Sequence, residues 1–154
     1  MGGGSGKKTS EGLLDHGGYW RSENEWPLAR REDRLLYLDE AGLDESPAET
    51  SDRDDFPYLA SSGVSSGIHW GGGIMPWGTP LDQRLDDANC VAYTSAPLEE
   101  DVEVTGTPIA RLFVSSTACV AYFRVKLIDV APDGTAKLVR YGGVNATHRQ
   151  SHVQ

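Results

Sequence analysis

The sequence Ala-Tyr-Phe-Arg-Val-Lys-Leu-Ile-Asp-Val-Ala-Pro-Asp-Gly-Thr, at residues 121–135, is the most informative about the fold. In its first part Phe123, Val125 and Leu127 alternate with polar neighbours, which places the apolar side chains on one face of a β-strand. In its last part the proline presets the backbone of a turn and the glycine can adopt a positive φ. The stretch therefore predicts a β-hairpin whose second strand covers residues 137–141.

Further strands are expected on both sides of this hairpin. Residues that favour β-structure gather in short stretches, separated by glycine, proline and polar residues. The additional predicted strands cover residues 35–38, 90–94, 102–105, 109–115 and 144–148. Two packed antiparallel sheets would bury the apolar faces of such strands. The 18 glycines and 8 prolines also favour short strands and tight turns over helices, so the sequence predicts an all-β fold.

The composition changes twice along the chain, which suggests three parts. Residues 1–16 are expected to be a flexible leader, because residues 1–11 are rich in glycine, serine and lysine. Residues 17–60 contain a long acidic stretch and one predicted strand, and we expect an irregular connection there. Residues 61–154 hold the remaining predicted strands and form the expected β-sandwich domain.

The overall charge and hydrophobicity exclude two classes of partner. A formal net charge of -9 opposes binding to nucleic acid, because such affinity comes from clustered lysine and arginine. No apolar run approaches the ~18 residues needed to cross a bilayer, so no membrane partner is expected. The first residues also lack the apolar stretch of a secretory signal, which predicts a cytoplasmic protein. In that setting Cys90 and Cys119 should be reduced thiols that fill space inside strands.

A serine-hydrolase pattern occurs at residues 63–67, where Gly-Val-Ser-Ser-Gly fits G-x-S-x-G around Ser65. A nucleophile elbow needs a buried strand before the serine and a helix after it. Here serines and Pro57 precede the pattern and three glycines follow it, so we interpret it as a flexible loop.

Metal and cofactor sites are not expected. His148 and His152 are spaced for one face of a helix, but they lie on a strand-like tail without a third ligand. The acidic clusters at residues 52–55 and 99–101 favour solvated surface, with calcium binding as the alternative.

Two tryptophans in the Gly- and Ser-rich stretch at residues 61–79 have two interpretations. Trp70 and Trp77 can pack against neighbouring protein, or they can stack on a sugar. Packing against protein is favoured, because large aromatic side chains dominate the energetics of interfaces.

Several motifs, in the same order, resemble the C-terminal domain of the X-Pro dipeptidyl-peptidase and cocaine-esterase family of serine hydrolases. The most specific is Tyr-Thr-Ser-Ala-Pro-Leu-Glu-Glu-Asp-Val-Glu-Val-Thr-Gly at residues 93–106. The resemblance also includes Leu81-Asp82-Gln83-Arg84, Val114-Ser115-Ser116, residues 127–134 and residues 145–151. Upstream it includes Trp20-Arg21, Glu25-Trp26-Pro27 and Leu36-Tyr37-Leu38.

The resemblance implies a jelly-roll β-sandwich of the galactose-binding type, attached to an α/β-hydrolase domain that holds a Ser-Asp-His triad. The triad lies upstream of all matched positions, so no catalytic residue is transferred to this chain. In the family a Gly-rich entry loop approaches the substrate pocket, and the positions that resemble it lie between residues 70 and 77. The candidate substrate-proximal residues are Trp70, Gly72, Gly73, Ile74, Met75 and Trp77.

Two departures from the family pattern affect these expectations. Val120-Ala121-Tyr122 stands where many relatives carry Asp-Thr-Asp, which removes the basis for a polar role there. Relatives also continue with further strands beyond the region of residues 149–151, so the sandwich is expected to be incomplete at its C-terminus. Its uncovered surface would associate with an α/β-hydrolase domain or chain of the same enzyme, or with a second copy in a homo-oligomer.

The leading hypothesis is a non-catalytic C-terminal sandwich that supports a serine hydrolase acting on peptide, amide or ester bonds and lines its substrate pocket. The alternative is a stand-alone carbohydrate- or ligand-binding module, with Trp20, Trp70 and Trp77 as stacking platforms. A third hypothesis, direct catalysis by this chain, depends on Ser65.

Overall fold

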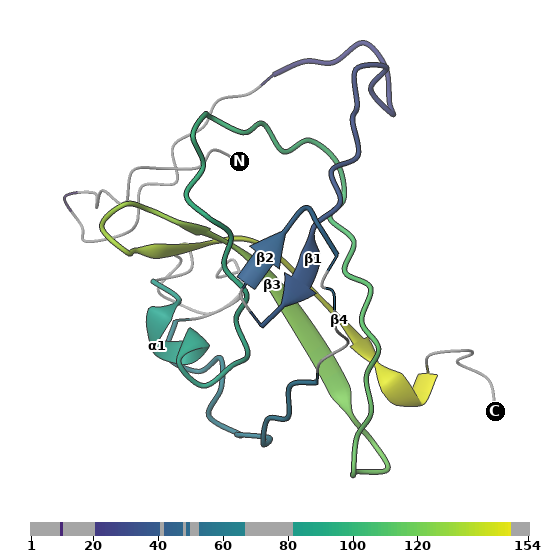
Figure 1. Ribbon diagram of the computed structural model, residues 1–154, viewed down its shortest axis with the longest axis vertical. Helices are drawn as coiled ribbons and strands as arrows, with labels where there is room; N and C mark the ends of the chain where they lie inside the picture. The colour runs from purple at the N-terminus through teal and green to yellow at the C-terminus, as the bar shows by residue number, and fades with distance from the viewer. Residues whose placement is uncertain are drawn as a thin grey trace. The chain divides into compact units, whose positions relative to one another are not determined.

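The computed structural model describes residue 10 and residues 21–40, 42–47, 49, 53–66 and 82–148. Its elements are β1 (Tyr37–Asp39), β2 (Gly42–Asp44), α1 (Arg84–Asp87), β3 (Tyr122–Val130), β4 (Ala136–Asn145) and the 3-10 helix η1 (Ala146–His148). The strands form two antiparallel pairs, β1 with β2 and β3 with β4 (Figure 1). Helix is confined to two single turns within these residues, so the chain is all-β as predicted.

The chain divides into two compact units. The first, which we call the hairpin unit, contains Met1–Tyr19, Ser66–Arg84 and Pro108–Gln154. The second, the acidic unit, contains Trp20–Ser65 and Leu85–Thr107, and acidic side chains outnumber basic ones among its described residues. The predicted division into a leader, a connection and a sandwich stays a prediction.

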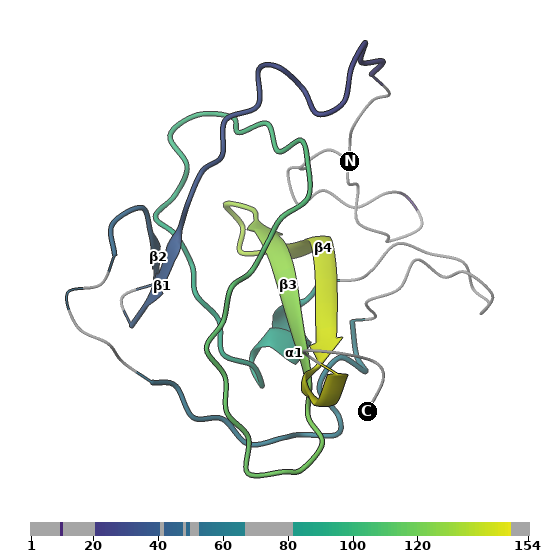
Figure 2. The same cartoon turned by 90° about the vertical axis from the view of Figure 1, so that its right-hand side faces the viewer.

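The β3–β4 hairpin forms where its sequence predicts (Figures 1 and 2). The turn closes through two backbone hydrogen bonds, from Gly134 N to Ala131 O at 2.8 Å and from Ala131 N to Thr135 O at 2.9 Å. Gly134 has a φ of 82°, a conformation in which a Cβ is strained. Asp133 Oδ1 accepts a further hydrogen bond from Thr135 N at 2.9 Å, so the aspartate and the glycine both stabilise the turn.

A β-bulge interrupts the register of the hairpin. Leu127 lies opposite Arg140 and Ile128 lies opposite Leu138, which leaves Val139 without a partner on β3. Ile128 and Leu138 therefore share one face of the hairpin, beside its buried end.

β4 is a single strand, although the sequence predicted two strands with a break at Gly142 and Gly143. The backbone continues through both glycines, and Tyr122 on β3 occupies the space that a side chain at position 143 would need. A Cβ on Gly143 would meet Tyr122 Cε1 at 2.8 Å. The predicted last strand is also wrong in part, since residues 146–148 form η1.

The acidic unit holds the shorter hairpin, in which Leu38 pairs with Leu43. Gly42 has a φ of 137° and lies against the backbone of Thr94, whose carbonyl oxygen would collide with any Cβ at this position. The absence of a side chain allows Leu43 N to donate a hydrogen bond to Thr94 O at 3.2 Å. Thr94 is therefore held beside β2 by a single backbone hydrogen bond and not by the ladder of bonds that joins two strands.

Three predicted strands are not strands in the structure: residues 90–94, 102–105 and 109–115. Their sequences favour β-structure, but a strand needs hydrogen bonds from a neighbour. Residues 90–115 pair with no neighbouring strand among the residues that the structure describes.

Much apolar surface is uncovered. The buried apolar side chains among the described residues are Leu28, Ala131, Ala136 and Leu138. In contrast, Phe113 is fully exposed, and Val125 and Leu127 on the predicted apolar face of β3 are 38% and 37% exposed. The alternation of β3 is confirmed as a strand pattern, whereas the jelly-roll arrangement that would cover this face stays a prediction.

Both cysteines differ from the expectation. Cys90 and Cys119 are free thiols, but they are exposed and lie outside strands rather than filling space within them. Among the described helices, none has the length and apolar character that crossing a membrane requires.

Candidate functional site

The predicted substrate-proximal residues lie outside the described part of the structure. These are Trp70, Gly72, Gly73, Ile74, Met75 and Trp77. The residues on either side of this segment are described, with Ser66 before it and Asp82 after it. The candidate site is therefore built from the residues that fix these two ends.

Asp82 caps the first residue of β4. Its Oδ1 accepts hydrogen bonds from Ala136 N at 3.2 Å and from Arg84 N at 3.2 Å. Its Oδ2 accepts from Arg84 Nε at 2.9 Å and forms an ion pair with the same guanidinium at 2.5 Å. Burial opposes ionisation of Asp82, but the hydrogen bonds from Arg84 and Ala136 outweigh it and lower the pKa of the carboxyl group.

Gln83 continues the contact and is completely buried. Its backbone N donates to Ala136 O at 2.9 Å, so residues 82 and 83 together satisfy both backbone groups of Ala136. Its side-chain Oε1 accepts from Lys126 Nζ at 3.1 Å, and its Nε2 donates to Ser66 O at 3.4 Å. One glutamine thus contacts β3, β4 and Ser66 within the hairpin unit.

A second buried polar residue lies near the turn of the hairpin. The Lys137 side chain is 2% exposed, and its Nζ lies 3.9 Å from Asp129 Oδ2 on the facing strand. That distance is too long for a hydrogen bond, and Lys137 Nζ has no hydrogen-bond partner among the described residues. The Asp129 carboxylate compensates the positive charge of Lys137, because a buried ammonium group without a nearby negative charge would be costly.

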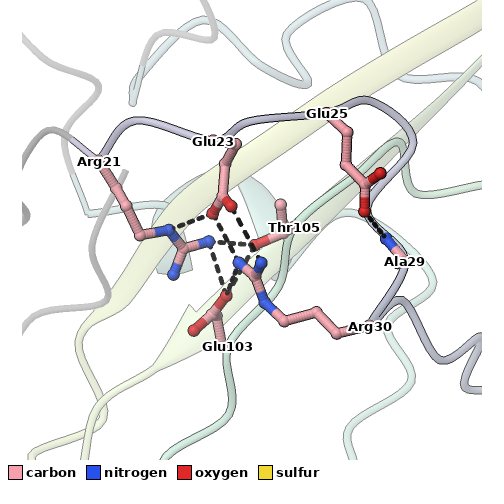
Figure 3. Close-up of polar contacts among 7 residues, drawn as sticks. All are labelled: Arg21, Glu23, Glu25, Ala29, Arg30, Glu103 and Thr105. Atoms are coloured by element: carbon pink, nitrogen blue, oxygen red, sulfur yellow. Dashed lines mark hydrogen bonds and ion pairs between the residues drawn. The ribbon is translucent and has the colours of Figure 1, made fainter.

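The acidic unit contains a network of two arginines and two glutamates (Figure 3). Arg30 donates to Glu23 through both of its Nη atoms, with distances of 2.9 Å and 2.5 Å. Arg21 bridges Glu23 at 2.5 Å and Glu103 at 2.7 Å, and Arg21 Nη2 also donates to Thr105 Oγ1 at 3.3 Å. The network ties residues 21–30 to residues 103–105, which lie about eighty positions further along the chain.

The charges in this network compensate one another. The hydrogen bond from Arg21, supported by one from Thr105, lowers the pKa of Glu103 to about 2. The hydrogen bond from Arg30 lowers the pKa of Glu23, and the hydrogen bond to Glu103 raises the pKa of Arg21. With every charge paired and the side chains between 25% and 58% exposed, the cluster is suited to holding two segments together rather than to proton transfer.

A third polar contact fixes the acidic segment before residue 60. Tyr93 OH donates a short hydrogen bond to Asp54 Oδ2, which raises the pKa of Tyr93 to about 12. Asp55 pairs with Arg53 at 2.6 Å. These aspartates are used in contacts with the chain itself, and the described residues contain no group of three or more metal-binding side chains.

The G-x-S-x-G pattern does not form an elbow in the described residues. Residues 60–66 form a turn and a bend, and residues 53–59 directly before them are not in a strand. Ser65 N donates to Asp86 Oδ1 at 3.3 Å, and Asp86 is 2% exposed in α1. Both residues belong to the acidic unit, and the contact is one that stabilises a turn.

Asp82 and Gln83 lie in the motif Leu81-Asp82-Gln83-Arg84, whose sequence does not predict what they do. Their role depends on meeting Ala136, more than fifty positions away, which no local pattern reveals. The Arg21–Glu103 pair was missed for the same reason. The sequence itself offers only an aspartate and a glutamine at the end of a glycine-rich stretch, which does not identify the contact.

Comparisons with known proteins agree on one relationship. The family of X-Pro dipeptidyl-peptidase C-terminal non-catalytic domains matches residues 2–154. The cocaine esterase of Rhodococcus sp. (strain MB1 Bresler) is 36% identical over 151 residues, which cover 87% of this chain and 25% of the esterase. Proteins named "Putative serine esterase" in Mycobacterium bovis and Mycobacterium tuberculosis are each 31% identical over 134 residues, covering 85% of this chain and 21% of theirs.

The chain thus spans a quarter or less of the length of these curated relatives. No solved structure matches it.

Proposed function

The chain belongs to the family of X-Pro dipeptidyl-peptidase C-terminal non-catalytic domains, and from that premise we propose that it supports the catalytic domain of a larger serine hydrolase. The match over residues 2–154 carries this proposal. The esterase names of its relatives support a parent enzyme that hydrolyses ester bonds, with peptide and amide bonds as the related substrate classes. In such an enzyme a serine attacks the carbonyl carbon, histidine takes its proton and aspartate orients the histidine.

The uncovered apolar surface supports a role in association. Phe113, Val125 and Leu127 are exposed in the chain taken alone, and exposed apolar surface of this kind is typical of a face that packs against other protein. We propose that the catalytic domain of the same enzyme, in one polypeptide or as a separate chain, contributes to covering it. A second copy of the chain in a homo-oligomer is the alternative cover.

The segment before Asp82 supplies the proposed contact with substrate. Trp70, Gly72, Gly73, Ile74, Met75 and Trp77 are proposed to line the mouth of the parent's substrate pocket. Large aromatic side chains present broad apolar surface to an organic acyl group, and glycines allow the backbone to approach closely. We propose that the enzyme works in a reducing, cytoplasmic location, in which Cys90 and Cys119 stay free thiols.

The test compares the 154-residue chain with the complete polypeptide that carries it, using hydrolysis of an activated ester. We expect turnover by the complete polypeptide, none by the chain alone, and unchanged turnover in the complete polypeptide when Ser65 is replaced in the variant Ser65→Ala. Turnover by the purified chain that disappears in Ser65→Ala would show that the chain is itself the enzyme. A complete polypeptide without hydrolase activity, together with sugar-dependent quenching of tryptophan fluorescence, would support the ligand-binding alternative instead.

A further inference from the structure

The two ends of the β3–β4 hairpin are paired in different registers. Near the turn Ile128 lies opposite Leu138. Beyond the bulge Leu127 lies opposite Arg140, so Val139 is the extra residue between the two registers. Because side chains alternate between the two faces of a strand, this shift by one residue decides on which face of the hairpin each later side chain of β4 lies.

Two adjacent glycines make a second register of β4 sterically possible. In the observed register Arg124 lies opposite Gly143, where a Cβ would meet Tyr122 Cε1 at 2.8 Å. If β4 continued from the turn without the bulge, Arg124 would lie opposite Gly142 instead, so the crowded position would again hold a glycine. Glycine-rich strands specify their register weakly. The outer part of the hairpin is therefore compatible with a bulged register and with a regular one.

The charges on the two strands favour the bulged register. In that register Lys126 lies opposite Tyr141, and Arg140 lies opposite the apolar Leu127. In the regular register Lys126 and Arg140 would lie directly opposite each other, and like charges in that arrangement destabilise a sheet. The bulge therefore separates two cations, although it leaves Val139 unpaired.

The two registers present different side chains on the uncovered apolar face of β3. In the bulged register Val125 lies opposite Gly142, which contributes no side chain. In the regular register Tyr141 would lie opposite Val125, and Val139 would lie opposite Leu127. The register of β4 thus sets the shape and the apolar area of this face.

We propose that residues 139–145 of β4 form a register switch. The hairpin exchanges between the bulged register and the regular register, and repulsion between Lys126 and Arg140 holds it in the bulged one. A change that reduces this repulsion shifts the hairpin toward the regular register and brings Tyr141 to the apolar face. This proposal is independent of the activity of the parent enzyme.

Disulfide formation in the full 154-residue chain measures the two registers separately, with both native cysteines replaced by serine. Phe123→Cys with Val144→Cys places two thiols opposite each other in the bulged register alone, and Val125→Cys with Tyr141→Cys does so in the regular register alone. Equilibration with glutathione gives the effective concentration of each pair. Because the regular register is the minor state, we expect the first pair to exceed the second by at least about tenfold.

Charge reversal tests the cause of this preference. Arg140→Glu would face Lys126 with an opposite charge in the regular register, and we expect it to raise the second pair relative to the first by about three- to tenfold. Lys126→Glu should act in the same direction, because its loss of the hydrogen bond to Gln83 is common to both registers. The double substitution restores like charges, so the ratio of the two pairs should return to its starting value.

Arg111→Glu is the matched control, since it makes the same change of charge in the hairpin unit but outside both strands. It should leave the ratio of the two cysteine pairs unchanged. The proposal is wrong if Arg140→Glu has no effect on this ratio or if Arg111→Glu has an equal effect. Equal closure of both pairs in Arg140→Glu would show loss of the hairpin rather than a change of register, and it would also overturn the proposal.

Discussion

Different interactions stabilise the interior of the hairpin unit and the interior of the acidic unit. In the hairpin unit a regular ladder between β3 and β4 and the buried side chains near the turn fix the structure. In the acidic unit the strands are three residues long, and exposed ion pairs such as Arg21–Glu103 join segments that have no ladder. A short-range sequence pattern is therefore sufficient for the β3–β4 hairpin, whereas the acidic unit depends on contacts between charged residues that are distant in sequence.

The largest expected effect tests whether apolar burial is concentrated in the hairpin unit. Leu138 is 9% exposed opposite Ile128, so Leu138→Ala should lower the free energy of opening of β3 and β4 by about 2–4 kcal/mol. The matched change in the acidic unit is Leu38→Ala, whose side chain is 44% exposed, and it should cost less than about 1 kcal/mol. Amide hydrogen exchange in each hairpin measures the free energy of opening in both variants. Equal losses of this free energy would show that apolar burial is not concentrated in the hairpin unit.

A smaller effect compares one glycine from each unit. Gly42→Ala combines a φ of 137° with a collision against the backbone oxygen of Thr94, and we expect it to destabilise β1 and β2 by about 2–3 kcal/mol. Gly134→Ala incurs the positive φ alone, because its Cβ would lie 3.5 Å from the flexible Arg84 side chain, and should cost about 1 kcal/mol.

Chemical denaturation monitored at each hairpin distinguishes these two glycines. If Gly134→Ala proved the more damaging, the close approach of Thr94 to Gly42 would not be a constraint on the acidic unit.

The smallest effect concerns the ion network. The folded-state pKa of Glu103 is about 2, below its usual 4.5, so its contribution to stability is complete above about pH 4.5 and is lost as the pH falls toward 2. Titration of the Glu103 carboxyl group by NMR measures this pKa directly. Glu103→Gln should remove the pH response of the contact between residues 21–30 and 103–105, and Glu99→Gln should not. A Glu103 titration near pH 4.5 would show that the network does not form in solution.

The sequence predicts the hairpin unit better than the acidic unit. The alternation at Phe123, Val125 and Leu127 and the turn at Gly134 predict β3, β4 and their connection, because all the deciding interactions lie within twenty-five residues. The same propensity wrongly predicted strands at residues 90–94, 102–105 and 109–115, since propensity does not supply a pairing partner. The family was recognised from its motifs, whereas the contact of Gln83 with Ser66 and Lys126 depends on tertiary structure.

The cap on Ala136 has a consequence for engineering. Asp82 and Gln83 fix the exit of residues 67–81, and Ser66 fixes the entrance, so both attachment points are set by residues outside the segment. Lengthening a segment between two fixed ends costs little free energy, because the entropy of closure grows slowly with length. Changes of sequence between positions 67 and 81 should therefore leave the register of the β3–β4 hairpin unchanged.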